Sequence, residues 1–229
     1  MAEHIVSSYD NVLDGLKALV TRMGNDAITM CERAVLAVIS SDIQMARDVV
    51  IFDKNINQME YEIREQASSI LALRAPMAND LRSVIGAIQI AANLERVGDL
   101  SKNIAKIGKK NELFIKHEFR AELEKMSHLA STNLGNVMSA YIEQDIEGSR
   151  SVLKADKDLD RLHKKFTKIL MAKMRETSYD IETLTQLLFV SRHLERVGDH
   201  SKNIAESIIY IDTGETGALD NLEDQHSVN

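Results

Sequence analysis

The sequence predicts an all-α protein built from two tandem three-helix bundles that arose by internal duplication. The 229 residues include one proline, ten glycines and only 4% aromatic residues, a composition that permits long helices and lacks the aromatic density of sheet proteins. Apolar residues recur at the alternating three-four spacing of packed helices. A twelve-residue motif, LERVGDLSKNIA at 94–105, also returns with one change as LERVGDHSKNIA at 194–205.

The repeat extends beyond this motif. The segment 53–60, DKNINQME, matches the segment 156–163, DKDLDRLH, which lies 103 residues later, whereas the motif itself returns after 100 residues. We therefore expect one connection to be three residues shorter in the second half. Such an in-register repeat is typical of a multi-element unit that was copied whole.

Apolar periodicity predicts the number and the approximate limits of the helices. We expect six helices, at about 5–40, 42–74, 77–108, 117–143, 146–176 and 179–211. Pro76 separates the second from the third, because a proline inside a helix costs about 3 kcal/mol and moves Ala75 out of helical geometry. The stretch Ser40-Ser41-Asp42 offers an N-cap for the second helix.

Two of these helices have clear packing seams. The apolar seam of the second comprises Val49, Phe52, Ile56, Met59, Ile63, Gln66, Ile70 and Leu73. The seam of the third consists of mostly small residues, Val84, Ala87, Ala91, Leu94, Gly98, Ser101 and Ala105. We expect the first bundle at 1–110, the second at 111–212, and a polar, disordered tail at 213–229.

The charge balance limits the class of partner. A net charge of −7 argues against nucleic-acid binding, which requires Lys and Arg to displace phosphate counterions, and favours cations or basic protein surfaces. No apolar run approaches the roughly 20 residues that cross a bilayer, and the first ten residues lack a signal-peptide pattern. We therefore expect a cytoplasmic protein without direct membrane insertion, in which the single cysteine, Cys31, is a core residue.

Acidic and amide side chains recur on the repeated helices at four-residue spacing, which places them on one face. They are Glu95, Asp99 and Asn103 in the first motif, Glu195, Asp199 and Asn203 in the second, and the adjoining strips Asp53 with Asn57 and Asp156 with Asp160. Like charges four residues apart oppose a helix by about 0.2–0.5 kcal/mol per pair, so we expect something to compensate for them.

Two kinds of compensation remain open from the residues alone. Arg82, Arg96 and Arg196, with nearby lysines, would make the acids a salt-bridge network on a solvated face. Alternatively, these oxygen-rich sets would hold divalent cations or iron. Binding would then be tighter in the second half, because Asp160 replaces Asn57 there.

The doubled motif resembles the PhoU family of phosphate-transport accessory and regulatory proteins. The resemblance also rests on the strips and on Pro76 followed by Asp80-Leu81-Arg82, although Asp180-Ile181-Glu182 stands at the corresponding place in the second half. It implies a homodimer of paired three-helix bundles with acidic patches that carry metal in some members. It also implies a cytoplasmic negative regulator of the phosphate-starvation response. Such a regulator couples the ATPase subunit of a phosphate ABC transporter to a sensor histidine kinase.

We expect an adaptor rather than an enzyme, because the sequence offers no nucleophile–base constellation and no glycine-rich phosphate-binding motif. Two alternatives remain: a metal-binding protein with a multinuclear carboxylate site, and an accessory protein of a phosphate permease. Phosphate itself is not the expected ligand, because anion sites favour clustered donors and the repeated surface is acidic.

Overall fold

The computed structural model describes residues 2–110, 115, 117–176 and 179–215. Within them the chain forms six α-helices and no strand, which confirms the predicted fold class. The helices are α1 (Ala2–Ser40), α2 (Ile43–Arg74), α3 (Ala78–Lys110), α4 (His117–Glu143), α5 (Ile146–Lys173) and α6 (Ile181–Thr213). The expected boundary between the bundles, and the expected tail from residue 216 onward, lie outside the described residues.

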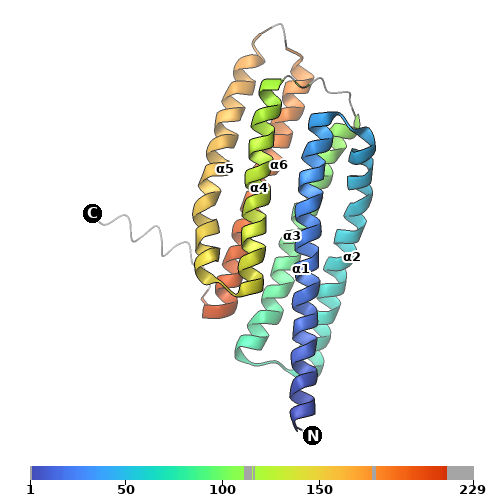
Figure 1. Cartoon of the computed structure of the whole chain (residues 1–229), viewed down its shortest axis with the longest axis vertical. Coiled ribbons are helices and arrows are strands. Elements are labelled where there is room, and N and C mark those ends of the chain that lie inside the picture. Colours follow the sequence, from blue (N-terminus) through green and yellow to red (C-terminus); the bar gives the residue numbers. More distant parts are fainter. Residues whose placement is uncertain (1, 111–114, 116, 177–178, 216–229) are drawn as a thin grey trace, which may run out of the picture.

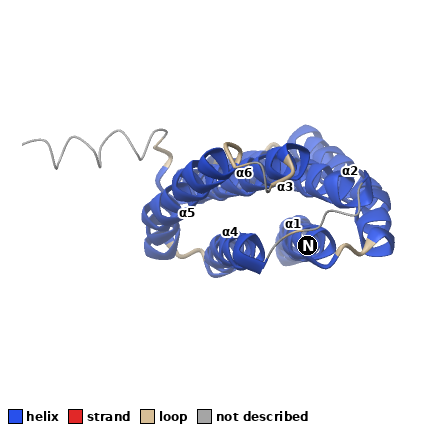
Figure 2. Cartoon of the chain, turned by 90° about the horizontal axis from the view of Figure 1, so that it is seen from above, coloured by secondary structure: helices blue, strands red, loops and turns tan. Residues whose placement is uncertain are grey.

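The two halves join through both of their layers (Figure 1). Helices α2, α3, α6 and α5 form one curved layer, and α1 and α4 lie side by side across it (Figure 2). Helix α3 packs against α6, and α1 packs against α4. The buried apolar residues of both halves form one continuous core, so the duplicated bundles share an interior. Cys31 is fully buried in this core, as expected.

The turns that end α1 and α4 repeat the same geometry. Ser41 and Gln144 both take left-handed backbone conformations, with φ of 57° and 56°. The next residues, Asp42 and Asp145, each donate their backbone N–H at 2.9 Å to the carbonyl five residues earlier, which is the Schellman arrangement. Asp42 also accepts the N–H of Met45 at 2.8 Å, so the N-cap predicted in the stretch Ser40-Ser41-Asp42 is its last residue.

The break at Pro76 is confirmed, whereas the expected seam of α2 is one residue too long. Helix α2 ends at Arg74, and Ala75 takes a left-handed conformation with φ of 45°. Leu73, predicted in the seam, is 80% exposed. It lies in the last turn before the break, where the seam has already passed the buried part of the bundle.

The three-residue difference between the halves does not lie in the loop. The connection between α5 and α6, residues 174–180, is longer than its counterpart at 75–77. The second half instead loses residues from its helices, because α5 ends at Lys173 and α6 begins only at Ile181, inside the predicted limits of 176 and 179. No proline occurs between these helices.

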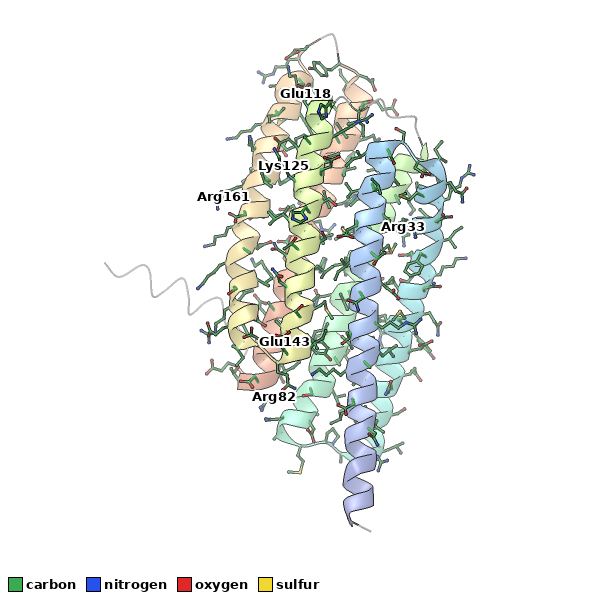
Figure 3. The ribbon with its side chains drawn as sticks, in the orientation of Figure 1. Arg33, Arg82, Glu118, Lys125, Glu143 and Arg161 are labelled. Atoms are coloured by element: carbon green, nitrogen blue, oxygen red, sulfur yellow. The ribbon has the colours of Figure 1, made fainter. Side chains whose placement is uncertain are left out.

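Arg82 connects the start of α3 to the end of α6 through hydrogen bonds. Its Nε donates to the Ile211 carbonyl at 2.9 Å, and Nη2 donates to the Asp212 carbonyl at 3.3 Å. These carbonyls belong to the last turn of α6, where a cation complements the negative end of the helix dipole. Arg82 is labelled at this end of the molecule in Figure 3. The arginine of the DLR tripeptide therefore has a structural role at this end of the molecule.

The small-residue seam of α3 lets its axis approach α2 closely. All seven predicted seam residues of α3 are buried. A Cβ added at Gly98 would lie 2.9 Å from Cγ2 of Ile56, a β-branched side chain with no exposed surface. The glycine is therefore required by the close approach of the two helices.

Gly98→Ala is expected to lower the free energy of unfolding, because overpacking costs about 1–3 kcal/mol and exceeds the gain in helix propensity of up to about 1 kcal/mol. Gly135→Ala is the matched control, since a Cβ there meets nothing within 4 Å, and it should stabilise the protein slightly. Urea unfolding of both variants measures the two signs. An equal stabilisation by both substitutions would contradict the close approach.

Candidate acidic sites on the repeated helices

In the first half, the acidic site lies at the seam between α2 and α3. Asp53 of α2 is only 5% exposed. Lys102 of α3 bridges Asp53 and Asp99, with its Nζ at 2.8 Å from Asp53 Oδ2 and 2.5 Å from Asp99 Oδ1. Arg96 lies 3.5 Å from both Glu95 and Asp99. An internal ammonium therefore neutralises the most buried carboxylate of this half.

In the second half, the same positions carry a weaker internal cation. Lys202 Nζ lies 3.7 Å from Asp156 Oδ2, and Asp199 forms no ion pair with any residue that the structure describes. Asp156 is 4% exposed, and its Oδ1 is buried without a hydrogen-bond partner. A Cβ at Gly198 would lie 2.6 Å from that oxygen, so the glycine makes the room in which this carboxylate sits.

The pKa values show that the acids of each half lie within electrostatic reach of one another. Burial, followed by repulsion from Asp99, raises the pKa of Glu95. Burial, followed by repulsion from Asp199, raises the pKa of Glu195. Burial also raises the pKa of Asp156 to about 6, against the attraction of Lys202. These are the shifts expected where carboxylates gather at low exposure.

The structure brings the carboxylates of the predicted sites together, but not their amides. The acids that act on the Glu95 and Glu195 carboxyl groups are Asp53, Glu60 and Asp99 in the first half and Asp156, Asp160 and Asp199 in the second. Asn203 instead donates its amide to Asn93 of α3 at 3.2 Å. Within the described residues, no hydrogen bond joins Asn57 or Asn103 to these carboxylates.

One acid of each site comes from a different position of the repeat, Glu60 in the first half and Asp160 in the second. Glu60 of α2 has His163 as its counterpart in α5, and His163 turns to Ser191 at 2.7 Å instead of completing an acidic strip. Asp160 supplies the carboxylate where the first half has Asn57. Each half therefore keeps the same number of nearby acids at shifted positions.

The sequence predicted only some of the cations that pair with the acidic side chains. Arg96 does pair with Glu95 and Asp99 of the first motif. Arg82 instead binds carbonyls at the end of α6, and Arg196 forms no ion pair among the described residues. The principal cations are Lys102 and Lys202. The available signal was their position three residues after Asp99 and Asp199, which places them on the same helix face.

The donor sets have the chemistry of a hard-cation site, because carboxylate oxygens are the ligands that such ions prefer. The buried Oδ1 atoms of Asp53 and Asp156 both lack partners, so each half retains acceptor capacity. As the side chains are placed, no group of three or more His, Cys, Asp or Glu in the described part of the chain converges closely enough to hold an ion.

The candidate sites belong to a duplicated, all-helical protein with matched acidic motifs. The PhoU domain model matches residues 20–108 and again 123–208, so the chain belongs to the PhoU domain family. In the described residues, no helix has the length and apolar character to cross a membrane.

Named relatives and solved structures agree with this assignment. A protein of Rhizobium meliloti named "Phosphate-specific transport system accessory protein PhoU homolog" is 37% identical over 92% of this chain and 90% of its own length. The crystal structure of PhoU from Pseudomonas aeruginosa superimposes with a TM-score of 0.86 at 30% identity, covering 90% of this chain and all of that one. A phosphate transport system regulatory protein PhoU from Streptococcus pneumoniae gives 0.85 at 29% identity, covering 92% and 100%.

Asp156→Asn is expected to change how stability depends on pH. Because burial raises the pKa of Asp156 from 3.8 to about 6, its ionisation weakens the native state as pH rises through that interval. The native protein should therefore lose about 1 kcal/mol between pH 5 and pH 8 through this group, and the variant should not. Urea unfolding of both proteins at the two pH values gives the difference. A difference that stays constant across this range would contradict the assignment.

Proposed function

We propose that this chain is a cytoplasmic accessory protein of a phosphate-specific transport system and a non-enzymatic, negative regulator of the phosphate-starvation response. It would couple the ATPase subunit of the transporter to a sensor histidine kinase. The names of relatives that match over most of its length support the first part. The second part, including homodimer formation, follows from the resemblance of the doubled motif.

The observation that carries the proposal is the placement of both acidic sites in one layer. Helices α3 and α6 pack side by side in the middle of the four-helix layer, while α1 and α4 cover its other face. Glu95 and Glu195 remain partly exposed, so they lie on the uncovered face. A surface with paired negative patches complements a basic protein surface, and such complementarity steers association and selects partners.

Capture of the two partners tests this proposal. The immobilised full-length chain is expected to retain the transporter ATPase and the cytoplasmic part of the kinase. Four neutralising substitutions on the uncovered face should weaken both interactions: Glu95→Gln, Asp99→Asn, Glu195→Gln and Asp199→Asn. Charge complementarity acts mainly on association, so we expect a loss of about tenfold or more at low salt and less at high salt.

A charge-matched variant on the opposite layer is the control. It carries four substitutions of exposed or half-exposed acids on α1 and α4: Asp26→Asn, Glu32→Gln, Glu124→Gln and Glu143→Gln. This variant should bind like the native chain. Equal losses in the two quadruple variants would show that net charge, and not the motif face, drives association. Retention of neither partner by the native chain would refute the adaptor function.

We further propose that the second acidic site binds a divalent cation or iron more tightly than the first. In the first half, Lys102 already places an ammonium between Asp53 and Asp99. In the second half, Lys202 lies farther from Asp156, so less internal positive charge opposes an incoming ion. The residues that would hold it are Asp156, Asp160, Glu195 and Asp199. An ion held there would add positive charge to the partner-binding face.

Metal titration of matched pairs tests this asymmetry. Glu195→Gln with Asp199→Asn is expected to lower the affinity for Mn²⁺ or Fe²⁺ by about tenfold or more, whereas Glu95→Gln with Asp99→Asn should have a smaller effect. Lys102→Met should raise affinity in the first half, because it removes the competing ammonium. Equal losses from the two carboxylate pairs would contradict the proposed order.

A further inference from the structure

A cavity of about 270 Å³ opens at the end of the molecule where α6 finishes. It lies between α1, the first turns of α3, the turn from α4 to α5 and the last turns of α6. Asp80, on its wall, lies about 22 Å along α3 from Glu95, at 1.5 Å per residue. Asp212, also on its wall, lies about 20 Å along α6 from Asp199 by the same rise, so the cavity is separate from the acidic sites of both halves, and the proposed accessory function does not use it.

The charged side chains around the cavity leave an unbalanced negative charge. Asp14, Asp80 and Asp212 line it, and none of these carboxylates forms an ion pair or a hydrogen bond with the described residues. The nearby cations are already engaged with helix ends. Lys17, which also lines the cavity, donates to the Ile142 carbonyl at 2.7 Å, and Arg82 donates to the last carbonyls of α6.

A second, independent feature points into the same space. Tyr141 lines the cavity and is only 7% exposed, yet its hydroxyl has no hydrogen-bond partner among the described residues. Burial raises the pKa of this phenol, so at neutral pH it remains a neutral donor and acceptor. The polar atom of a largely buried side chain ordinarily has a hydrogen-bond partner, which water or a ligand in the cavity would supply here.

The remaining wall is apolar and includes Leu16, Ala87 and Ile208, all of them buried. The ligand chemistry follows from three features of the cavity: unpaired carboxylates, an apolar wall and one hydroxyl without a protein partner. We propose that this cavity binds a small organic ammonium compound. Its hydrocarbon part lies against the apolar wall, and its ammonium group donates to the carboxylates and to the Tyr141 oxygen. An anion would meet three carboxylates and one ammonium, that of Lys17, and this net negative charge disfavours inorganic phosphate as a ligand.

Hexylammonium is a suitable probe, with hexanoate as an isostere of opposite charge. Calorimetric titration of the full chain at low salt is expected to give saturable hexylammonium binding with a Kd of about 1 mM or tighter, from burial of roughly six carbon groups. Hexanoate should bind at least about tenfold more weakly, and inorganic phosphate should not compete. Absence of saturation, or equal binding of hexanoate, would overturn the proposal.

Three variants locate the binding in this cavity. Ala87→Leu fills the space and should abolish binding in a protein that still unfolds cooperatively. Tyr141→Phe should weaken binding by about 2- to 10-fold, the loss expected for one hydrogen bond. Asp14→Asn should weaken it by up to about fivefold, as for an exposed ion pair, while Asp26→Asn farther along α1 should leave it unchanged. If Ala87→Leu does not fold, the other variants decide. Unchanged binding in both Tyr141→Phe and Asp14→Asn would place the probe elsewhere and overturn the proposal.

Discussion

The close approach of each motif helix to the helix before it is the constraint on which the rest of the structure depends. At Gly98 and Gly198 there is no space for a side chain beyond hydrogen, because Ile56 and Asp156 already occupy it. Helices that pack this closely bury whatever lies on the facing strip, including a carboxylate in each half. A buried carboxylate must be paired or shift its pKa, and the two halves meet this requirement differently.

The difference between the halves arises from side-chain placement and not from the motif. The LERVGD and SKNIA parts are the same in both copies of the motif, so each copy contains the equivalent lysine, Lys102 or Lys202. Lys102 nevertheless reaches two carboxylates, whereas Lys202 remains 3.7 Å from one. Burial raises the pKa of Asp156, and Lys202 at 3.7 Å offsets this shift only in part. Duplication has thus produced two sites with similar carboxylates and different internal ion pairs.

The contact between α3 and α6 makes the two halves one body and also breaks their symmetry. The single difference within the repeated motif, Leu100 against His200, lies at this contact, where His200 Nδ1 and Asn93 Oδ1 are 2.9 Å apart. Arg82 closes one end of the same contact by holding the last carbonyls of α6. The cavity lies beside this closed end, so it is a product of how the halves meet and not of either bundle alone.

The sequence by itself determined the helices, the duplication and the family, because periodicity, capping residues and Pro76 act over a few neighbouring positions. It also identified the carboxylates that gather, since four-residue spacing on a helix defines a face. It did not identify which cation pairs with which acid, where Arg82 binds, or that Asn203 turns to Asn93. Those outcomes depend on how two helices from distant parts of the chain are rotated and spaced relative to each other. Only the packed core decides that geometry, because a shift of a few ångströms separates an ion pair from an unpaired charge.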